Sequence, residues 1–208
     1  MTQMCVMVPA LPAADGLRLL SEALSAAPIA AVVIMPGADG VIAPDAALPL
    51  IAAAQKSSAA ALIYGDAQLA RTLKADGVHL PWSVDVRTAA EDAREILGQG
   101  GIIGADAGTS RHDAMELGEL GVDYVAFGLG DGDAELARED RDELVAWWAE
   151  IFEIPVVALD VAGASEAATL KAAAADFISV RLSAGADAAR TLSEISAAAP
   201  AARTEPAA

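Results

Sequence analysis

Residues 102–127 read IIGADAGTSRHDAMELGELGVDYVAF, and this stretch decides the fold class. Its first four residues form a short apolar run, which is typical of a buried strand. A turn with Asp106 and Gly108 follows, and Thr109 or Ser110 is placed to cap the helix that comes next. A second apolar run, YVAF, follows that helix. The stretch therefore predicts a strand–helix–strand unit with parallel strands.

Short apolar runs of this kind recur along the whole chain, and Ala-rich amphipathic patterns separate them. The runs are MCVMV (4–8), AAVVIM (30–35), AALI (60–63), GVHL (77–80), GIIGA (101–105), YVAF (124–127), PVVAL (155–159) and FISV (177–180). Their continuous apolar character fits parallel strands that are covered on both faces. Eight strands with eight following helices predict an α/β fold, a single (β/α)8 TIM barrel. An open doubly wound sheet is the alternative, although it would not need eight matched units.

The predicted barrel domain spans residues 1–198. The remaining residues, 199–208, are low in complexity and show no apolar periodicity, which predicts a disordered C-terminal tail. Pro49 lies inside the second helical pattern, DAALPLIAAAQKS. Because an interior proline removes a helical hydrogen bond, we expect this helix to begin firmly only late in the pattern.

The charge balance limits the partners that this chain can bind. It carries 13 basic and 30 acidic residues, which gives a net charge of −17. Nucleic acid and anionic membrane surfaces would be repelled, so neither is expected as a partner. A phosphorylated small molecule stays compatible with the sequence, since a local arginine or a helix N-terminus can override the global field.

The chain has one cysteine, Cys5, so no disulfide framework and no cysteine metal site can form within it. Its first apolar run is only a few residues long and has no basic leader. We therefore expect neither a signal peptide nor a membrane span, and predict a cytoplasmic protein.

In a (β/α)8 barrel the active site lies at the carboxyl ends of the strands, and acidic residues dominate those positions here. They are Asp66, Asp85, Asp106, Asp131, Asp133 and Asp160. Two or three such carboxylates converging at one mouth would bind Mg²⁺. The alternative is that most of them cap helices or form turns. Asp66 is the clearest candidate for both roles.

Three further side chains are candidates for the mouth. His79 is either a general acid or base or a buried, hydrogen-bonded side chain. Trp82 either stacks on a flat heterocycle or closes the barrel end. Arg181, the one basic residue at a strand end, either binds a phosphate or pairs with a rim aspartate.

Residues 73–128 resemble the thiamine-phosphate synthase family, which includes the related thiazole tautomerases (TenI-like proteins). The shared features are ADGVHL, IIG with a short turn, ELGVDYVAFG and IPVVAL, in this order and at about the family's spacing. The resemblance extends from about residue 60 to about residue 183. It implies a (β/α)8 barrel, a homodimer, and a transferase of thiamine biosynthesis. That enzyme joins a pyrimidine diphosphate to a thiazole phosphate with Mg²⁺ and releases pyrophosphate.

The active-site positions depart from the family pattern. Asp66 matches the family's Asn-Asp pair, but Gly65 replaces the asparagine, and Asp85 lies about one residue out of register with the second metal aspartate. Asp106 and Gly108 stand where the family has Ser-x-His. The family's basic and amide residues after strand two, its Thr- and Lys-containing loop after strand six and its Gly-Gly after strand seven are replaced by VVIMPGADG, GLGDGDAEL and LDVAG.

These departures leave three hypotheses. The chain is a divergent thiamine-phosphate synthase, a non-catalytic ligand-binding or regulatory barrel of the same family, or an enzyme with a different metal-dependent activity at the acidic rim. Because a diphosphate needs cations or N–H donors to neutralise it, we expect degraded or altered coupling activity. The candidate ligand-binding residues are Asp106, Gly108, Trp82, Asp160 and Arg181, and the candidate metal ligands are Asp66 and Asp85.

Overall fold

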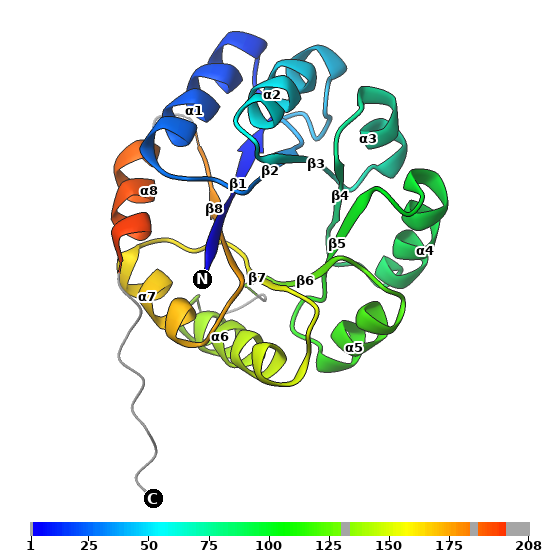
Figure 1. The fold of residues 1–208 in the computed structure, drawn as a ribbon, viewed down its shortest axis with the longest axis vertical. Coiled ribbons are helices and arrows are strands. Elements are labelled where there is room, and N and C mark those ends of the chain that lie inside the picture. Colours follow the sequence, from blue (N-terminus) through cyan, green and yellow to red (C-terminus); the bar gives the residue numbers. More distant parts are fainter. Residues whose placement is uncertain (1, 130–133, 184–186, 199–208) are drawn as a thin grey trace, which may run out of the picture.

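Eight parallel strands form a closed barrel, and eight helices surround it (Figure 1). The computed structural model describes residues 2–129, 134–183 and 187–198. The strands follow one another in chain order, and the last pairs with the first in a register from Gln3 opposite Phe177 to Met7 opposite Arg181. This pairing confirms the (β/α)8 barrel and shows that the alternative, an open doubly wound sheet, is wrong.

The strands are short, and each is followed by one helix. The strands are β1 (Gln3–Pro9), β2 (Ala31–Met35), β3 (Ala60–Tyr64), β4 (Gly77–Leu80), β5 (Ile102–Asp106), β6 (Tyr124–Phe127), β7 (Val156–Ala158) and β8 (Phe177–Arg181). The helices are α1 (Ala13–Ala26), α2 (Pro44–Lys56), α3 (Ala67–Leu73), α4 (Val86–Leu97), α5 (Arg111–Glu119), α6 (Ala134–Ile151), α7 (Ala164–Ala172) and α8 (Ala188–Ala197).

The late start expected for the second helix is wrong. Helix α2 begins at Pro44, and Pro49 lies inside it. Pro44 occupies the first helical position, where the missing N–H has no intrahelical partner in any case and the fixed φ suits a helix. Leu50 and Ile51, which directly follow Pro49, are buried, so packing against the barrel outweighs the hydrogen bond that the proline removes.

The apolar side chains form two clusters, one on each side of the barrel wall. The larger cluster lies between the strands and the helices and contains the fully buried Trp148. The smaller cluster fills the barrel interior: Cys5, Met7, Val33, Leu62, Ala126, Val157 and Leu159. Strand residues alternate between the two clusters because successive side chains point to opposite faces.

Three aspartates hold the strands together at the amino end of the barrel. Asp76 precedes β4 and accepts a hydrogen bond from the backbone N–H of Ala61 at 2.7 Å. In the same way Asp123 precedes β6 and accepts from Ile103 N–H at 2.8 Å. Asp176, before β8, accepts from Val156 N–H at 2.9 Å. The carboxylate before each of these strands therefore fixes the neighbouring strand that precedes it in the chain.

Two predictions concern the ends and surface of the molecule. No helix among the described residues is long and apolar enough to cross a membrane. The predicted disordered tail, 199–208, lies outside the described residues, so its boundary stays a prediction.

Candidate functional site

The carboxyl ends of the strands meet at one end of the barrel, which we call the mouth. Arg181 at the end of β8 contacts Asp160 after β7: Nε donates to one carboxylate oxygen at 2.8 Å and Nη2 to the other at 3.3 Å. Nη1 lies 3.1 Å from the sulfur of Met35 at the end of β2. The predicted pairing of Arg181 with a rim aspartate is therefore confirmed. This two-point contact commits the guanidinium to a carboxylate.

Asp106 is the second carboxyl group at the mouth. One of its oxygens accepts a hydrogen bond from Gly108 N–H at 2.8 Å, and Gly128 N–H donates to the carboxylate as well. Burial raises the pKa of Asp106 to about 6, although these two N–H groups oppose the shift. Near neutral pH both the protonated and the ionised form of this carboxyl group are populated. It can therefore act as a general acid, as a general base or as a hydrogen-bond acceptor for an N–H group.

The loop after β5 passes under Trp82. Gly108 has φ +59, and a Cβ there would lie only 2.7 Å from the Trp82 ring. A side chain at position 108 would therefore displace the indole. Trp82 itself remains 53% exposed, so one face of the ring is supported and much of the rest is open to solvent. Stacking on a flat ligand and closing the barrel end both stay compatible with this position.

Below the mouth, His79 is buried and hydrogen-bonded, which confirms the second of the two roles predicted for it. Its Nδ1 lies 2.9 Å from the Tyr124 hydroxyl, and Tyr64 packs on it with ring centroids 5.8 Å apart. Burial lowers the pKa of His79 to about 4, and the charge of Arg181 acts in the same direction. The imidazole is therefore neutral at physiological pH and belongs to the packed barrel interior.

The two predicted metal ligands lie at the amino ends of helices. Asp66 caps α3, where its carboxylate accepts from Leu69 N–H at 2.8 Å, and this confirms the capping role. Asp85 occupies the cap position of α4 without a side-chain hydrogen bond. Among the described residues no three histidine, cysteine, aspartate or glutamate side chains group so that they could hold a metal ion. Mg²⁺ is usually held by one or two carboxylates together with substrate oxygens, so a metal role for Asp66 and Asp85 stays a prediction.

Two other rim aspartates of the sequence prediction, Asp131 and Asp133, lie outside the described residues. In the described part of the chain, Arg181 is the only arginine or lysine in a strand, and the loops from strands to helices contain neither residue type. The loops after β2, β3 and β4 add only carboxylates, Asp39, Asp66 and Asp85, all of them exposed. The one cation of the described mouth is therefore Arg181, which is paired with Asp160.

Three residues near the mouth were missed by sequence reasoning. Tyr124 begins the predicted strand run YVAF and Tyr64 directly follows the run AALI, and neither was given a role. Burial and the nearby charge of Asp106 raise the pKa of Tyr64. Arg141 lies within a charged helical pattern that is typical of a solvated face, but it is fully buried and donates to the carbonyl of Leu159 at 2.7 Å. No signal in the local sequence distinguishes it from the exposed arginines.

A search against protein families matches residues 4–184 to thiamine monophosphate synthase. The chain belongs to this family. It is 41% identical to the thiamine-phosphate synthase of Hyphomonas neptunium over 177 residues, which cover 78% of this chain and 76% of that protein. It is 40% identical to the thiamine-phosphate synthase of Erythrobacter litoralis over 136 residues, 64% of this chain and 62% of that protein.

Solved structures support the fold of this thiamine monophosphate synthase family member. The thiamine phosphate pyrophosphorylase of Pyrococcus furiosus superposes with a TM-score of 0.72 at 21% identity and covers 93% of both chains. At that identity the likeness establishes the barrel and no more. The family assignment therefore rests on sequence, and the chemistry of the mouth must be argued from the residues that this family member presents there.

Proposed function

We propose that this chain is a thiamine monophosphate synthase family barrel that no longer catalyses the coupling of a pyrimidine diphosphate to a thiazole phosphate at its mouth. In its place the mouth binds a flat nitrogen heterocycle that carries no phosphate. The observation that carries the proposal is the Asp160–Arg181 pair, because it neutralises the one strand-borne cation of the described mouth.

The energetic argument concerns the diphosphate. Each charge-assisted hydrogen bond to an anion contributes about 1.5–3 kcal/mol. Without two such contacts the binding of a diphosphate weakens by roughly two to four orders of magnitude. Asp106 adds a negative charge whenever it is ionised, which repels an anionic ligand further.

The same residues suit a ligand that is neutral or positively charged. The Asp106 carboxyl group can accept a hydrogen bond from a ring N–H or amino group, or donate one to a ring nitrogen when it is protonated. The exposed part of Trp82 offers an aromatic surface beside it, and Gly108 leaves room for that ring. Asp106, Gly108, Trp82, Asp160 and Arg181 are therefore the proposed ligand-binding set.

The resemblance to the family also concerns Mg²⁺. Members of this family use the ion with their phosphorylated substrates, and Asp66 and Asp85 are the residues that would hold it here. Bound there, Mg²⁺ would supply positive charge for a phosphate oxygen. Since Asp66 already caps α3, we expect this chain to bind Mg²⁺ weakly.

A direct assay tests the proposal. The purified chain is incubated with the pyrimidine diphosphate, the thiazole phosphate and Mg²⁺, and released pyrophosphate is measured. The Pyrococcus furiosus thiamine phosphate pyrophosphorylase serves as a positive control. We expect no release above the level without protein, whereas clear turnover would establish the second candidate function, the coupling reaction itself, which the 41% identical Hyphomonas neptunium relative favours.

Ligand binding is measured separately by calorimetry and by quenching of tryptophan fluorescence. We expect the phosphate-free pyrimidine and thiazole to bind at least tenfold more tightly than their phosphorylated forms. Trp82→Phe keeps an aromatic ring, so it should retain the binding. It should lose most of the quenching, because the other two tryptophans, Trp147 and Trp148, lie on helix α6 outside the barrel and not at the mouth.

A further inference from the structure

The segment that carries Asp160, Leu159–Gly163, adopts an unusual backbone conformation. Asp160 has φ +57, which is the left-handed region. Among the described residues three other non-glycine side chains have positive φ, Ser58, Lys74 and Ala174, and all three follow the carboxyl ends of helices. Asp160 alone follows a strand and faces the mouth. A left-handed non-glycine residue at such a place requires surroundings that impose it.

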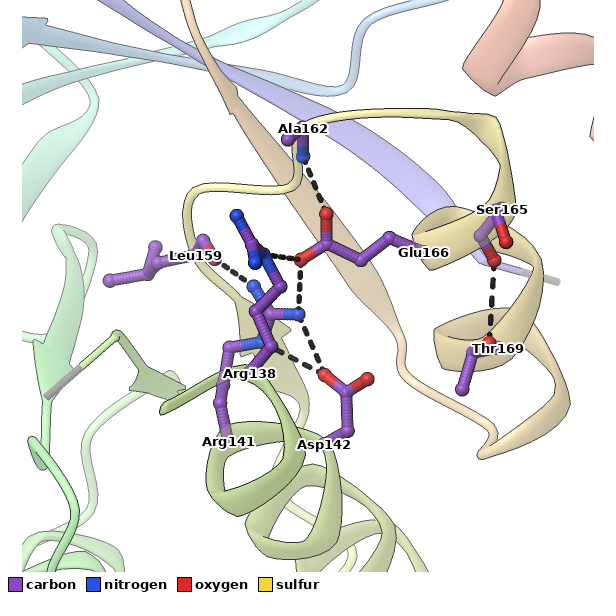
Figure 2. A network of polar contacts seen from close by, with 8 residues as sticks. All are labelled: Arg138, Arg141, Asp142, Leu159, Ala162, Ser165, Glu166 and Thr169. Carbon is purple, nitrogen blue, oxygen red and sulfur yellow. Dashed lines mark hydrogen bonds and ion pairs between the residues drawn. The ribbon is translucent and has the colours of Figure 1, made fainter. Parts of the chain in front are cut away.

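Four hydrogen bonds fix the chain around Asp160, two before it and two after it. Leu159 N–H donates to the carbonyl of Phe127 at 2.9 Å. The Leu159 carbonyl accepts from Arg141 Nη1 at 2.7 Å. Val161 N–H donates to the carbonyl of Ser179 at 2.9 Å. Ala162 N–H donates to Glu166 Oε2 at 2.8 Å (Figure 2). The peptides on both sides of Asp160 are therefore fixed, and its φ follows from them.

Two of these bonds depend on a single ion pair. Arg141 Nη2 contacts Glu166 Oε1 at 2.5 Å, while the other oxygen of Glu166 receives Ala162 N–H. Arg141 also donates from Nε and Nη2 to Asp142 Oδ1, at 3.0 and 2.7 Å. Its side chain is 0% exposed and that of Glu166 is 13% exposed. A buried ion pair is seldom a gain in stability over apolar packing, and this one fixes the geometry of the loop after β7.

We propose that Arg141 is a positioning residue that determines whether the mouth binds anionic ligands, an inference that rests on the proposed function. Through the Leu159 carbonyl and Glu166 it holds Asp160 in the left-handed conformation that sets its carboxylate against Arg181. Arg181 is thereby withdrawn from anionic ligands. When this clamp is weakened, the guanidinium of Arg181 becomes available to a phosphate oxygen.

Arg141→Lys tests the proposal, because a lysine keeps the charge but cannot reach the Leu159 carbonyl, Asp142 and Glu166 together. The readout is the NMR signal of Arg181 Nε–H, with Asp160→Asn as the reference for a guanidinium without its ionic partner. We expect Arg141→Lys to move this signal at least halfway toward the reference. Inorganic pyrophosphate, measured by calorimetry, should bind at least tenfold more tightly than to the unmodified chain.

Arg138→Lys is the matched control, since Arg138 lies three residues earlier on the same helix and its Nε is 3.9 Å from the same Glu166 oxygen. It should leave the Arg181 signal and the affinity for pyrophosphate unchanged. If Arg141→Lys fails to fold, Glu166→Gln replaces it, because Glu166 presents one oxygen to Arg141 and the other to Ala162, whereas glutamine turns an NH₂ group toward one of these two donors.

A folded Arg141→Lys or Glu166→Gln variant whose Arg181 signal matches that of the unmodified chain would overturn the positioning role. Failure of the proposed function looks different. In that case the unmodified chain binds pyrophosphate tightly, and the NMR signal of Arg181 Nε–H shifts on binding. The role of Arg141 is still decided by comparing this signal between the variants and the unmodified chain without ligand.

Discussion

Asp106 is a largely buried carboxyl group at the mouth, at a position where the family resemblance predicts a hydroxyl. Its environment is mixed, because two backbone N–H groups favour the charged form while burial opposes it more strongly. The result is a pKa of about 6 in place of the usual 3.8. A carboxyl group held in this state weakens the folded protein at neutral pH, which is typical of a residue kept for function rather than for stability.

Replacing this carboxyl group by an amide should stabilise the protein at alkaline pH. Because the folded chain holds the proton of Asp106 more tightly than the unfolded chain does, stability is lost as pH rises from about 4 through about 6. Asp106→Asn stays neutral and avoids this loss. We expect its free energy of unfolding, from urea titration, to exceed that of the unmodified chain by about 1–2 kcal/mol at pH near 8, and the excess to vanish near pH 4.

The control for this measurement is Asp85→Asn, because Asp85 is exposed and makes no side-chain capping bond. It should change stability by less than about 0.5 kcal/mol at both pH values. The low pKa of His79 acts in the opposite sense, since stability falls as pH drops below about 6, but it affects every variant equally. An Asp106→Asn variant less stable than the unmodified chain at pH near 8 would contradict the prediction.

At the scale of elements, the aspartates that precede β4, β6 and β8 act as pins between neighbouring strands. Each lies near the surface, and its carboxylate accepts a hydrogen bond from a backbone N–H at the start of the adjacent strand. These N–H groups lie at the amino end of the barrel and need a partner. Asp76 also accepts from Gln55 Nε2 at 3.2 Å, but only Asp123 receives a charged second donor among these three, Arg94 Nη2 at 2.9 Å. Arg94 also binds the carbonyls of Gly98, Gly101 and Gly121.

Loss of the Asp123 pin should therefore destabilise the barrel. Asp123→Asn keeps one acceptor oxygen but loses the ion pair with Arg94, and we expect the free energy of unfolding to fall by about 1–3 kcal/mol. Thermal and urea unfolding measure the change. Asp92→Asn, on the exposed face of α4, should shift stability by less than about 0.5 kcal/mol. Equal stability of the two variants would show that the ion pair between Asp123 and Arg94 contributes nothing.

The elements themselves were largely predictable from sequence, and the reason is visible in particular strands. The runs GVHL and YVAF coincide with β4 and β6, and an aspartate directly precedes each of them. Local patterns also predicted a cap at Asp66 and a cap at Thr109 or Ser110, of which the structure shows Ser110; both caps use hydrogen bonds three residues away. Pro49 misled the prediction because burial of its neighbours, a tertiary effect, overrides the local cost.

The site was less predictable, because its contacts join residues far apart in the chain. An ion pair between Arg181 and some rim aspartate was predicted, but the choice of Asp160 depends on its left-handed backbone and on the barrel register. The contact between His79 and Tyr124 spans 45 residues. Arg141 resembles its exposed neighbours in sequence, and only the packing of α6 against the loop after β7 buries it.

At the scale of the whole molecule, the net charge of −17 is the dominant property. The ion pairs between described residues are mostly exposed, as in Arg18–Glu22 and Arg190–Glu194, and exposed pairs contribute little. The excess of acidic residues therefore produces self-repulsion that the pairs do not cancel. This negative field also opposes the approach of phosphorylated ligands. It therefore favours the neutral or positively charged ligands that we propose for the mouth.

Salt should consequently stabilise this protein. Raising NaCl from about 10 mM to about 300 mM shortens the Debye length from about 30 Å to about 6 Å, which screens the repulsion more than it weakens the few exposed pairs. We expect the Tm to rise by roughly 3–6 °C at pH near 8, and this gain to disappear near the isoelectric point of about 4.2. KCl should act like NaCl, and a Tm that falls with salt at pH near 8 would contradict the prediction. MgCl₂ at matched ionic strength then isolates the metal question, because an additional rise that Asp66→Asn or Asp85→Asn removes would indicate a bound ion at the predicted ligands.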